Sequence, residues 1–194
     1  MSKNQHRGKV IIDMSMSLDG FIAGPGDTPD QPLGKGGEIL HDWLGDPEAF
    51  SRAYGDVDEA PTAVIMGWRT YQNSLPYWNG KGPMGDTPCF VLTDKVPDEA
   101  SDVFTFITEG GITNSLEQAQ KVTNGRNIGL MGASIDQQFL KAGLVDTIRI
   151  HLIPVLLGDG ISLFDHLGTL TKLEKLECLD APEGTHLTYR VVNS

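Results

Sequence analysis

The fold is decided by residues 127–153, which read NIGLMGASIDQQFLKAGLVDTIRIHLI. Asn127 to Met131 is a short apolar run typical of a buried strand, and the small residues at 132–134 turn the chain directly into a helix. Gly143 supplies a helix stop, after which residues 147–152 alternate between polar and apolar side chains with the period of a strand. Strand, helix and strand in this order predict an α/β sheet.

The rest of the chain continues this alternation. We expect strands at 10–16, 62–66, 89–93 and 103–107, helices at 68–74 and 115–122, and a last strand around 187–191. The pattern predicts one α/β domain over residues 1–194, with a mixed, mostly parallel central sheet and an antiparallel C-terminal strand pair. Residues 1–8 are expected to form a flexible tail, and the Gly- and Pro-rich stretch 24–37 a long loop beside the active site.

Two segments are ambiguous by pattern alone. Residues 38–54 carry apolar side chains at helical spacing, but Pro47 is expected to break or restart the helix. Leucines recur at every third position from Leu167 to Leu179, which favours a helix over a strand.

Composition and charge exclude several classes of protein. The 194 residues include 15 Lys plus Arg against 26 Asp plus Glu, a formal net charge of −11 that argues against a nucleic-acid-binding surface. The apolar stretches are too short to span a membrane, and the N-terminal residues lack the apolar core of a secretory signal. Cys89 and Cys178 form no ligand cluster. We therefore expect a metal-free cytoplasmic protein that binds neither nucleic acid nor membrane.

Several motif-based activities are excluded as well. Gly80, Gly82 and Gly85 form a literal G-x-G-x-x-G, but Pro83 interrupts it and a strand rather than a helix follows, so it is a loop. The chain has neither a P-loop sequence nor a G-x-S-x-G nucleophile elbow. The histidines lack metal-binding helical spacing, and His151, on the polar face of its expected strand, is expected to be solvated or hydrogen-bonded.

Two strand-to-helix junctions have the chemistry of a phosphate-binding turn. In the first, Gly67 follows a strand and opens a helix in which Arg69 offers a forked guanidinium and Thr70 a hydroxyl donor. In the second, Gly132 follows a strand, and the helix that begins there presents backbone N–H groups. Taken alone, each turn is better explained as a connection that needs glycine for packing. Together, at the carboxyl ends of strands, they predict a nucleotide site.

Taken together, these residues resemble the dihydrofolate reductase fold, and in particular the C-terminal reductase domain of bifunctional riboflavin-biosynthesis deaminase-reductases. The resemblance rests on four stretches in order: Ser17-Leu18-Asp19-Gly20-Phe21-Ile22-Ala23, Met66-Gly67-Trp68-Arg69-Thr70-Tyr71, Gly143-Leu144-Val145-Asp146, and Pro154-Val155-Leu156-Leu157-Gly158-Asp159-Gly160 with Leu163-Phe164. It covers residues 9–192 and implies a three-layer α/β fold. It also implies a strand over Lys172 to Cys178, where the charged residues leave no separate polar helix face, and we take this segment as a strand.

The resemblance implies NADPH as the cofactor. The residues that would hold it are Ser15 and Ile22 beside the nicotinamide, Gly67, Arg69 and Thr70 at the phosphates, Thr93, Asp94 and Lys95 near the adenosine ribose, and Gly132, Ala133, Ser134 and Ile135 under the pyrophosphate and nicotinamide. Lys95 or Arg69 would meet the 2′-phosphate, whereas Asp94 would repel it if it pointed inward.

The chain departs from the family pattern at two places. The second turn reads Gly132-Ala133 where the family usually has two glycines, so the methyl group would crowd the cofactor or select a shifted pose. The acidic residue on the first helix of dihydrofolate reductases has no counterpart, because aligning Trp43 places Leu40 at its position. This second departure argues against a folate substrate.

The implied reaction is hydride transfer from NADPH to a C=N or C=O carbon of a small polar substrate, such as a pyrimidine, a pterin or a ribosylamine. A 5-amino-6-(5-phosphoribosylamino)uracil reductase-like role in riboflavin biosynthesis fits this pattern. Asp19 and Asp42 are the candidate proton donors, since a carboxyl desolvated beside Trp43 would have a raised pKa. Trp43, Tyr77 and Trp78 are the candidate substrate-binding residues.

Other functions remain open at this point. Ala133 and the missing acid favour a sensor that binds NADPH without turnover, and a dihydrofolate or pterin reductase and a structural dimer with a degenerate site are further alternatives. The resemblance also implies a homodimer that associates through residues 147–153.

Overall fold

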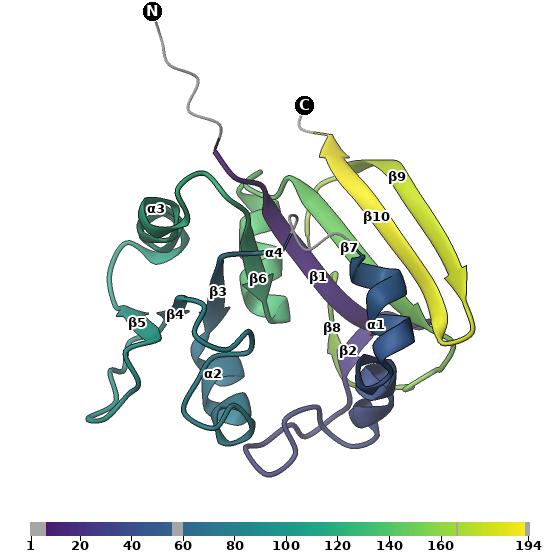
Figure 1. The fold of residues 1–194 in the computed structure, drawn as a ribbon, viewed down its shortest axis with the longest axis horizontal. Coiled ribbons are helices and arrows are strands. Elements are labelled where there is room, and N and C mark those ends of the chain that lie inside the picture. The colour runs from purple at the N-terminus through teal and green to yellow at the C-terminus, as the bar shows by residue number, and fades with distance from the viewer. Residues whose placement is uncertain (1–6, 56–59, 166, 193–194) are drawn as a thin grey trace, which may run out of the picture.

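A computed structural model of the chain describes residues 7–55, 60–165 and 167–192, and Figure 1 shows its fold. The strands of its main sheet are β1 (Val10–Ser17), β3 (Ala63–Gly67), β4 (Cys89–Leu92), β5 (Phe104–Ile107), β6 (Ile128–Met131), β7 (Thr147–Ile153), β9 (Lys172–Ala181) and β10 (Gly184–Val192). Within the described ranges they form one eight-stranded sheet in the order β5-β4-β3-β6-β1-β7-β10-β9. Two short strands, β2 (Phe21–Ala23) and β8 (Ile161–Ser162), pair separately.

The pairing confirms the predicted mixed sheet. Neighbouring strands are parallel along the part of the sheet that runs β5-β4-β3-β6-β1-β7. Strand β10 is antiparallel to both of its neighbours, β7 and β9. The carboxyl ends of β3, β6 and β1 therefore meet at one edge of the sheet, where α/β proteins of this kind bind ligands.

Helices cover both faces of the sheet, which confirms the three layers. One face packs against α3 (Gly111–Thr123) and α4 (Ala133–Lys141), whose Leu116 and Phe139 share a core cluster with Ile65 and Ile128. The other face is covered by α2 (Trp68–Ser74) with the short η3 (Leu75–Tyr77), and by η1 (Gly37–Gly45) with α1 (Pro47–Tyr54). Figure 1 shows α1 in front of the end of the sheet that carries β7 and β10.

The segment predicted as one interrupted helix over 38–54 consists of two different helices. Its first part, η1, is a 3-10 helix, and the break falls next to Pro47 as predicted. Asp46 is extended and its side chain accepts hydrogen bonds from the backbone N–H groups of Glu48 and Ala49, which starts α1. Pro47 occupies the first turn of α1, where the absence of an N–H costs nothing.

The leucine-rich segment is the strand β9, as expected, and not a helix. It pairs with β10 over its whole length, with a register shift opposite Thr188 and Tyr189. Leu176 falls at this shift, between the partners Lys175 and Glu177. The irregularity breaks the two-residue alternation, which explains why the leucine spacing did not read as a strand.

Both the last part of the predicted tail and the predicted loop make defined contacts. Residues 1–6 of the predicted tail lie outside the described residues, whereas Arg7 forms an ion pair with Asp146 at 2.9 Å. The loop over 24–37 is closed on itself by Gly24 N–H to Leu33 carbonyl at 2.8 Å.

Candidate functional site

The two predicted phosphate-binding turns lie side by side in the structure. Met66 and Met131 are direct partners in the β3–β6 ladder, so Gly67 and Gly132, which follow them, leave the sheet at the same point. A Cβ built on Gly132 would stand 2.4 Å from Thr70 Oγ1, and Gly132 has φ +102°, a conformation that favours glycine. Thr70 of the first turn thus closes against Gly132 of the second.

Contact between the turns continues on the other side. A Cβ on Gly67 would lie 3.5 Å from Ile135 of α4, at ordinary contact distance. Ala133, the residue expected to crowd a cofactor, is buried in the core cluster, so its methyl group packs inward. Ser134 next to it is exposed, and its Oγ accepts a hydrogen bond from Gln138 Nε2 at 3.2 Å. The structure therefore gives no steric reason why Ala133 would close this turn.

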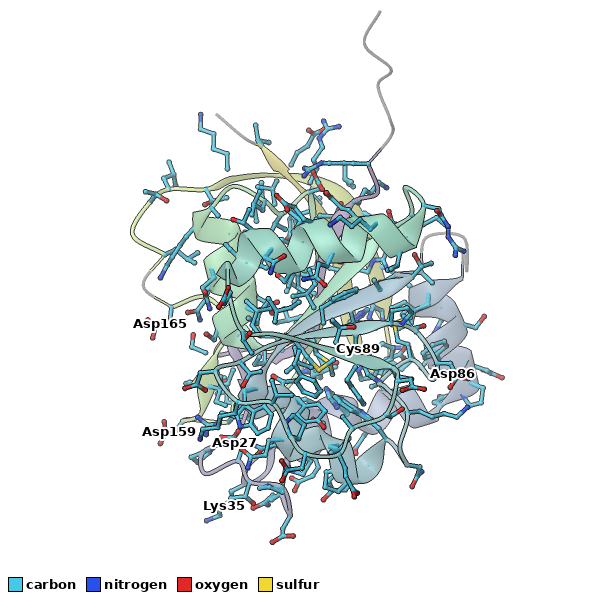
Figure 2. All side chains as sticks on the ribbon, turned by 90° about the vertical axis from the view of Figure 1, so that its left-hand side faces the viewer. Asp27, Lys35, Asp86, Cys89, Asp159 and Asp165 are labelled. Atoms are coloured by element: carbon cyan, nitrogen blue, oxygen red, sulfur yellow. The ribbon has the colours of Figure 1, made fainter. Side chains whose placement is uncertain are left out.

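Arg69 does not fork toward an open turn, as the sequence suggested, but holds the loop 24–37. Its guanidinium donates to both carboxylate oxygens of Asp27, with Nε at 2.7 Å from Oδ2. Asn73 Nδ2 donates to the same carboxylate at 2.8 Å, and the Asp27 side chain is only 5% exposed. In Figure 2, Asp27 and Lys35 of this loop lie toward the same end of the molecule. Sequence reasoning missed this role because the partner is 42 residues away.

The residues predicted near an adenosine ribose form a compact turn after β4. Thr93 Oγ1 accepts from the backbone N–H of Lys95 at 2.9 Å and donates to the Lys95 carbonyl at 3.0 Å. The side chains of Asp94 and Lys95 are exposed. Since β4 is the neighbour of β3, this turn borders the same sheet edge as Gly67.

The residues predicted beside the nicotinamide are both buried near the end of β1. Ile22 lies in β2 and belongs to the main core cluster. Ser15 points to the face covered by η1, and its Oγ accepts a hydrogen bond from Trp43 Nε1 at 3.0 Å. Trp43 is therefore a buried residue that packs over Ser15, and it does not present an exposed surface to a substrate.

The two predicted proton donors differ in their surroundings. Asp19 accepts from Ser17 Oγ at 2.6 Å and from the backbone N–H groups of Leu157 and Gly158 at 3.1 and 2.7 Å. The Ser17 hydrogen bond holds the pKa of Asp19 below its ordinary value, which is the opposite of what a proton donor requires. These contacts give Asp19 a structural role in holding the loop after β7, whereas Asp42 is an exposed side chain on η1.

The predicted aromatic wall separates into packing residues. Trp78 stacks on Phe104 at 6.1 Å between ring centroids and packs on the cluster formed by Tyr71 and its neighbours. Tyr77 is exposed, and its hydroxyl donates to the Asp30 carbonyl at 3.0 Å, a second tie to the loop 24–37.

A buried polar network on β1, β7 and α1 was not predicted. Asp13 Oδ1 lies 2.8 Å from His151 Nε2 and 3.1 Å from the Tyr54 hydroxyl, while Arg149 Nη1 donates to Asp13 Oδ2 at 3.2 Å. His151 Nδ1 lies 2.7 Å from Nδ1 of His186, which comes from β10. His151 is 1% exposed and His186 6%, so the expected hydrogen-bonded role of His151 on the polar face of its strand is confirmed, and this face is buried rather than solvated.

The network continues to the surface through Glu183. His186 Nε2 lies 3.4 Å from Glu183 Oε1, and Arg52 of α1 donates to Glu183 Oε2 at 2.9 Å. Trp43 lies over both imidazoles, with its ring centroid 4.6 Å from that of His151 and 5.2 Å from that of His186. The indole that caps Ser15 thus also covers the histidine pair.

The distances assign the protons of the network. With a carboxylate oxygen at His151 Nε2, that nitrogen carries a proton, and His151 Nδ1 accepts from His186 Nδ1–H. His186 Nε2 can donate to Glu183 at the same time only when the His186 ring is protonated. Burial and the nearby Asp13 raise the pKa of Tyr54 far above its usual range, so its hydroxyl stays a donor. Burial, followed by the neighbouring His151, lowers the pKa of His186.

Two features of the sequence are consistent with this network. Asp13 is the one charged residue in the apolar run of β1, and Arg149 and His151 share one face of β7. The ladder pairs Asp13 with Arg149 and Ser15 with His151 directly. Only the adjacency of β1 and β7, which the pattern does not give, brings these groups together.

In residues 7–55, 60–165 and 167–192, no group of three or more His, Cys, Asp or Glu side chains is placed to hold a metal ion. The helices of this described part include none that is long and apolar enough to cross a bilayer.

The fold and the paired glycine turns define an α/β protein of the dihydrofolate reductase type. Solved structures that share it include the pyrimidine reductase-like protein of Corynebacterium diphtheriae, with TM-score 0.64, 13% identity and coverage of 98% of this chain and 94% of that one. Dihydrofolate reductase of Enterococcus faecalis, complexed with NADP(H), matches with TM-score 0.59, 13% identity and coverage of 96% and 98%. Riboflavin biosynthesis reductase Rib7 of Saccharomyces cerevisiae matches with TM-score 0.61, 14% identity and coverage of 99% and 93%.

The chain belongs to the RibD C-terminal domain family, whose model matches residues 8–187. Among curated proteins, the uncharacterized protein YwjB of Bacillus subtilis is 32% identical over 167 residues, covering 85% of this chain and 87% of that protein. The uncharacterized protein YyaP of the same organism is 28% identical over 182 residues, covering 84% of each. At 13–14% identity, the structural neighbours show that this chain has their fold.

Proposed function

We propose that the chain is an NADPH-dependent reductase that delivers a hydride to a C=N or C=O carbon of a small polar substrate. The observation that carries the proposal is the meeting of the Gly67 and Gly132 turns at the edge shared by β3 and β6. A pyrimidine of the kind reduced in riboflavin biosynthesis is the substrate class that we favour, in keeping with the family and with Rib7.

The residues at this edge fit a dinucleotide phosphate group. Only glycine fits at position 132, because a Cβ there would collide with Thr70 Oγ1 at 2.4 Å, and this close packing brings the Thr70 hydroxyl to the start of α4. The first turn of α4 adds backbone N–H groups that lack intrahelical partners, and the positive end of the helix dipole. Lys95 supplies an exposed cation for a 2′-phosphate, whereas Arg69 would have to exchange Asp27 for it.

When bound, the nicotinamide would supply the hydride, and the chain would position the substrate and supply the proton. The buried Asp13–His151–Tyr54 group is better placed for the proton than Asp19, because it lies on the β1 face two residues from Ser15. Asp42 remains the alternative donor from η1. We further propose a cytoplasmic homodimer; β7 is paired on both edges, so association there would use its face.

The first test is thermal unfolding of the protein with NADPH and with NADH. A ligand at 100 times its dissociation constant stabilises the fold by about 2.7 kcal/mol. We expect a clear rise in Tm with NADPH, a smaller one with NADH, and loss of both rises in Gly132→Ala. No shift with either nucleotide would contradict the proposal.

Turnover separates a reductase from a sensor. Oxidation of NADPH, followed by its absorbance, is measured over a panel of pyrimidine, pterin, imine and carbonyl compounds. Steady oxidation with any member supports the reductase, and its loss in His151→Asn with an unchanged NADPH-induced Tm shift places the proton source in the buried network. Nucleotide binding without oxidation across the panel would favour the sensor.

A further inference from the structure

A cavity lies away from the glycine turns, between α1 and the strands β7, β10 and β9. Its volume is about 520 Å³, within the range of small-molecule sites. Lys9, which precedes β1, and Thr147, which begins β7, line one end, so the cavity reaches the amino ends of the parallel strands. The glycine turns follow the carboxyl ends of β3 and β6, at the opposite edge of the sheet.

Trp43 lies between Ser15 of β1 and the two histidines of the cavity. Its indole N–H donates a hydrogen bond to Ser15, and its ring lies over His151 and His186. Both histidines line the cavity. Tyr54 stacks on Trp43 at 5.9 Å and also lines the cavity. A ligand in the cavity would contact Tyr54 and His151, which belong to the proposed proton source, but none of the residues of the glycine turns.

The lining is rich in hydrogen-bond donors. Among the described residues that line the cavity, the charged ones are Lys9, Arg52 and Arg149 against the single carboxylate of Glu177. This is the reverse of the whole chain, whose net charge is −11. Arg52 donates a hydrogen bond to Glu183 at 2.9 Å, and its Nη1 lies 3.9 Å from Glu48 Oε2, which leaves further N–H donors among the five of its guanidinium. The two guanidinium groups enter from opposite walls, α1 and β7, and are joined to each other through the Asp13–His151–His186–Glu183 chain.

The remaining lining suits a flat or apolar body. Leu176 and Leu179 of β9 form one wall, and the rings of Tyr54, His151 and His186 another. Leu176 is 53% exposed and so offers apolar surface at the border of the cavity. We propose that this cavity binds a small organic anion, with its carboxylate or phosphate group at Arg52 and Arg149 and its body against the leucines and rings.

Glu177 is the carboxylate of the cavity lining that opposes the binding of an anion. It is exposed on β9, it pairs with Thr188 in the ladder, and it forms no ion pair with another described residue. Its negative charge limits the affinity for an anion, so removing it should strengthen binding. Asp180 offers a matched control, since it lies on the same strand, is exposed, and does not line the cavity.

The test is calorimetric titration of the cofactor-free protein with benzoate, with the neutral and nearly isosteric benzamide, and with inorganic phosphate. We expect the protein to bind benzoate at least about tenfold more tightly than benzamide. Glu177→Gln should tighten benzoate binding by about threefold or more, Arg52→Gln should weaken it by about tenfold, and Asp180→Asn should leave it unchanged. Phosphate binding stronger than benzoate binding would keep the anion site and assign its group as phosphate.

Two results would overturn the proposal: equal affinity for benzoate and benzamide, or equal effects of Glu177→Gln and Asp180→Asn. The Glu177→Gln variant should fold like the wild type, because this side chain is exposed on an edge strand. The titration contains no nucleotide, so its outcome is independent of the proposed reductase activity. NADPH oxidation with the tightest-binding anion then distinguishes a substrate, which is consumed, from an effector, which is not.

Discussion

Replacing Asp136 by asparagine should stabilise the protein by an amount that grows with pH. Asp136 lies in the first turns of α4, is 0% exposed, and neither carboxylate oxygen has a hydrogen-bond partner among the described residues. Burial raises the pKa of this carboxyl well above its ordinary value, so the folded protein keeps it protonated. Asparagine has nearly the same shape but cannot ionise in either state.

The magnitude follows from proton linkage. The unfolded chain ionises Asp136 at an ordinary pKa of about 3.9, whereas the folded chain does not. Stability from this group is fully present below the unfolded pKa and is lost as pH rises toward the folded pKa. The loss is about 0.5 kcal/mol at pH 4 and about 1.5 kcal/mol at pH 5, as long as the folded carboxyl stays protonated. The unpartnered amide of the variant adds a constant that does not change with pH.

Urea unfolding of both proteins at pH 4, 5 and 6 measures the difference directly. The free energy of unfolding of Asp136→Asn minus that of the wild type should rise by about 1 kcal/mol from pH 4 to pH 5. Asp180→Asn, at an exposed position on β9, is the control and should show no such rise. A difference that stays flat over this pH range would refute the reasoning, because it would mean that Asp136 ionises equally in the two states.

Three further predictions address the site and its loop. Asp27→Asn should release Arg69 and speed proteolytic cleavage within the loop 24–37 roughly fivefold, because a contact on the order of 1 kcal/mol is lost; an unchanged rate would assign the loop's order to other ties. Gly132→Ala should destabilise the fold by about 1–3 kcal/mol in a thermal melt, since its Cβ would strike Thr70 Oγ1, whereas Gly143→Ala, at φ +66° in open space, should cost about 1 kcal/mol. Relative to His186→Gln, the wild type should lose stability as pH falls below about 6.5, because burial lowers the pKa of His186 and the unfolded chain takes up the proton first; equal pH profiles would argue against this shift.

The architecture was predictable because local signals agree with it. Short apolar runs followed by Gly67 and Gly132 gave strand-to-helix turns, and the ladder partners Met66 and Met131 bring those turns together. The order of strands was accessible only through the family resemblance, since periodicity says which residues form a strand but not which strand lies next to it. Where local geometry is irregular, as at the register shift beside Leu176, the pattern failed to identify the strand.

Side-chain partners at the site escaped prediction for a related physical reason. A guanidinium is suited equally to a phosphate and to a carboxylate, so the sequence alone cannot show that Asp27 occupies Arg69. The same holds for Asp13, which as an isolated charge in an apolar strand had to be paired, although nothing local named His151 and Arg149 as its partners. A buried charge in a strand therefore marks a network whose other members lie on the neighbouring strands, and the cross-strand register is what identifies them.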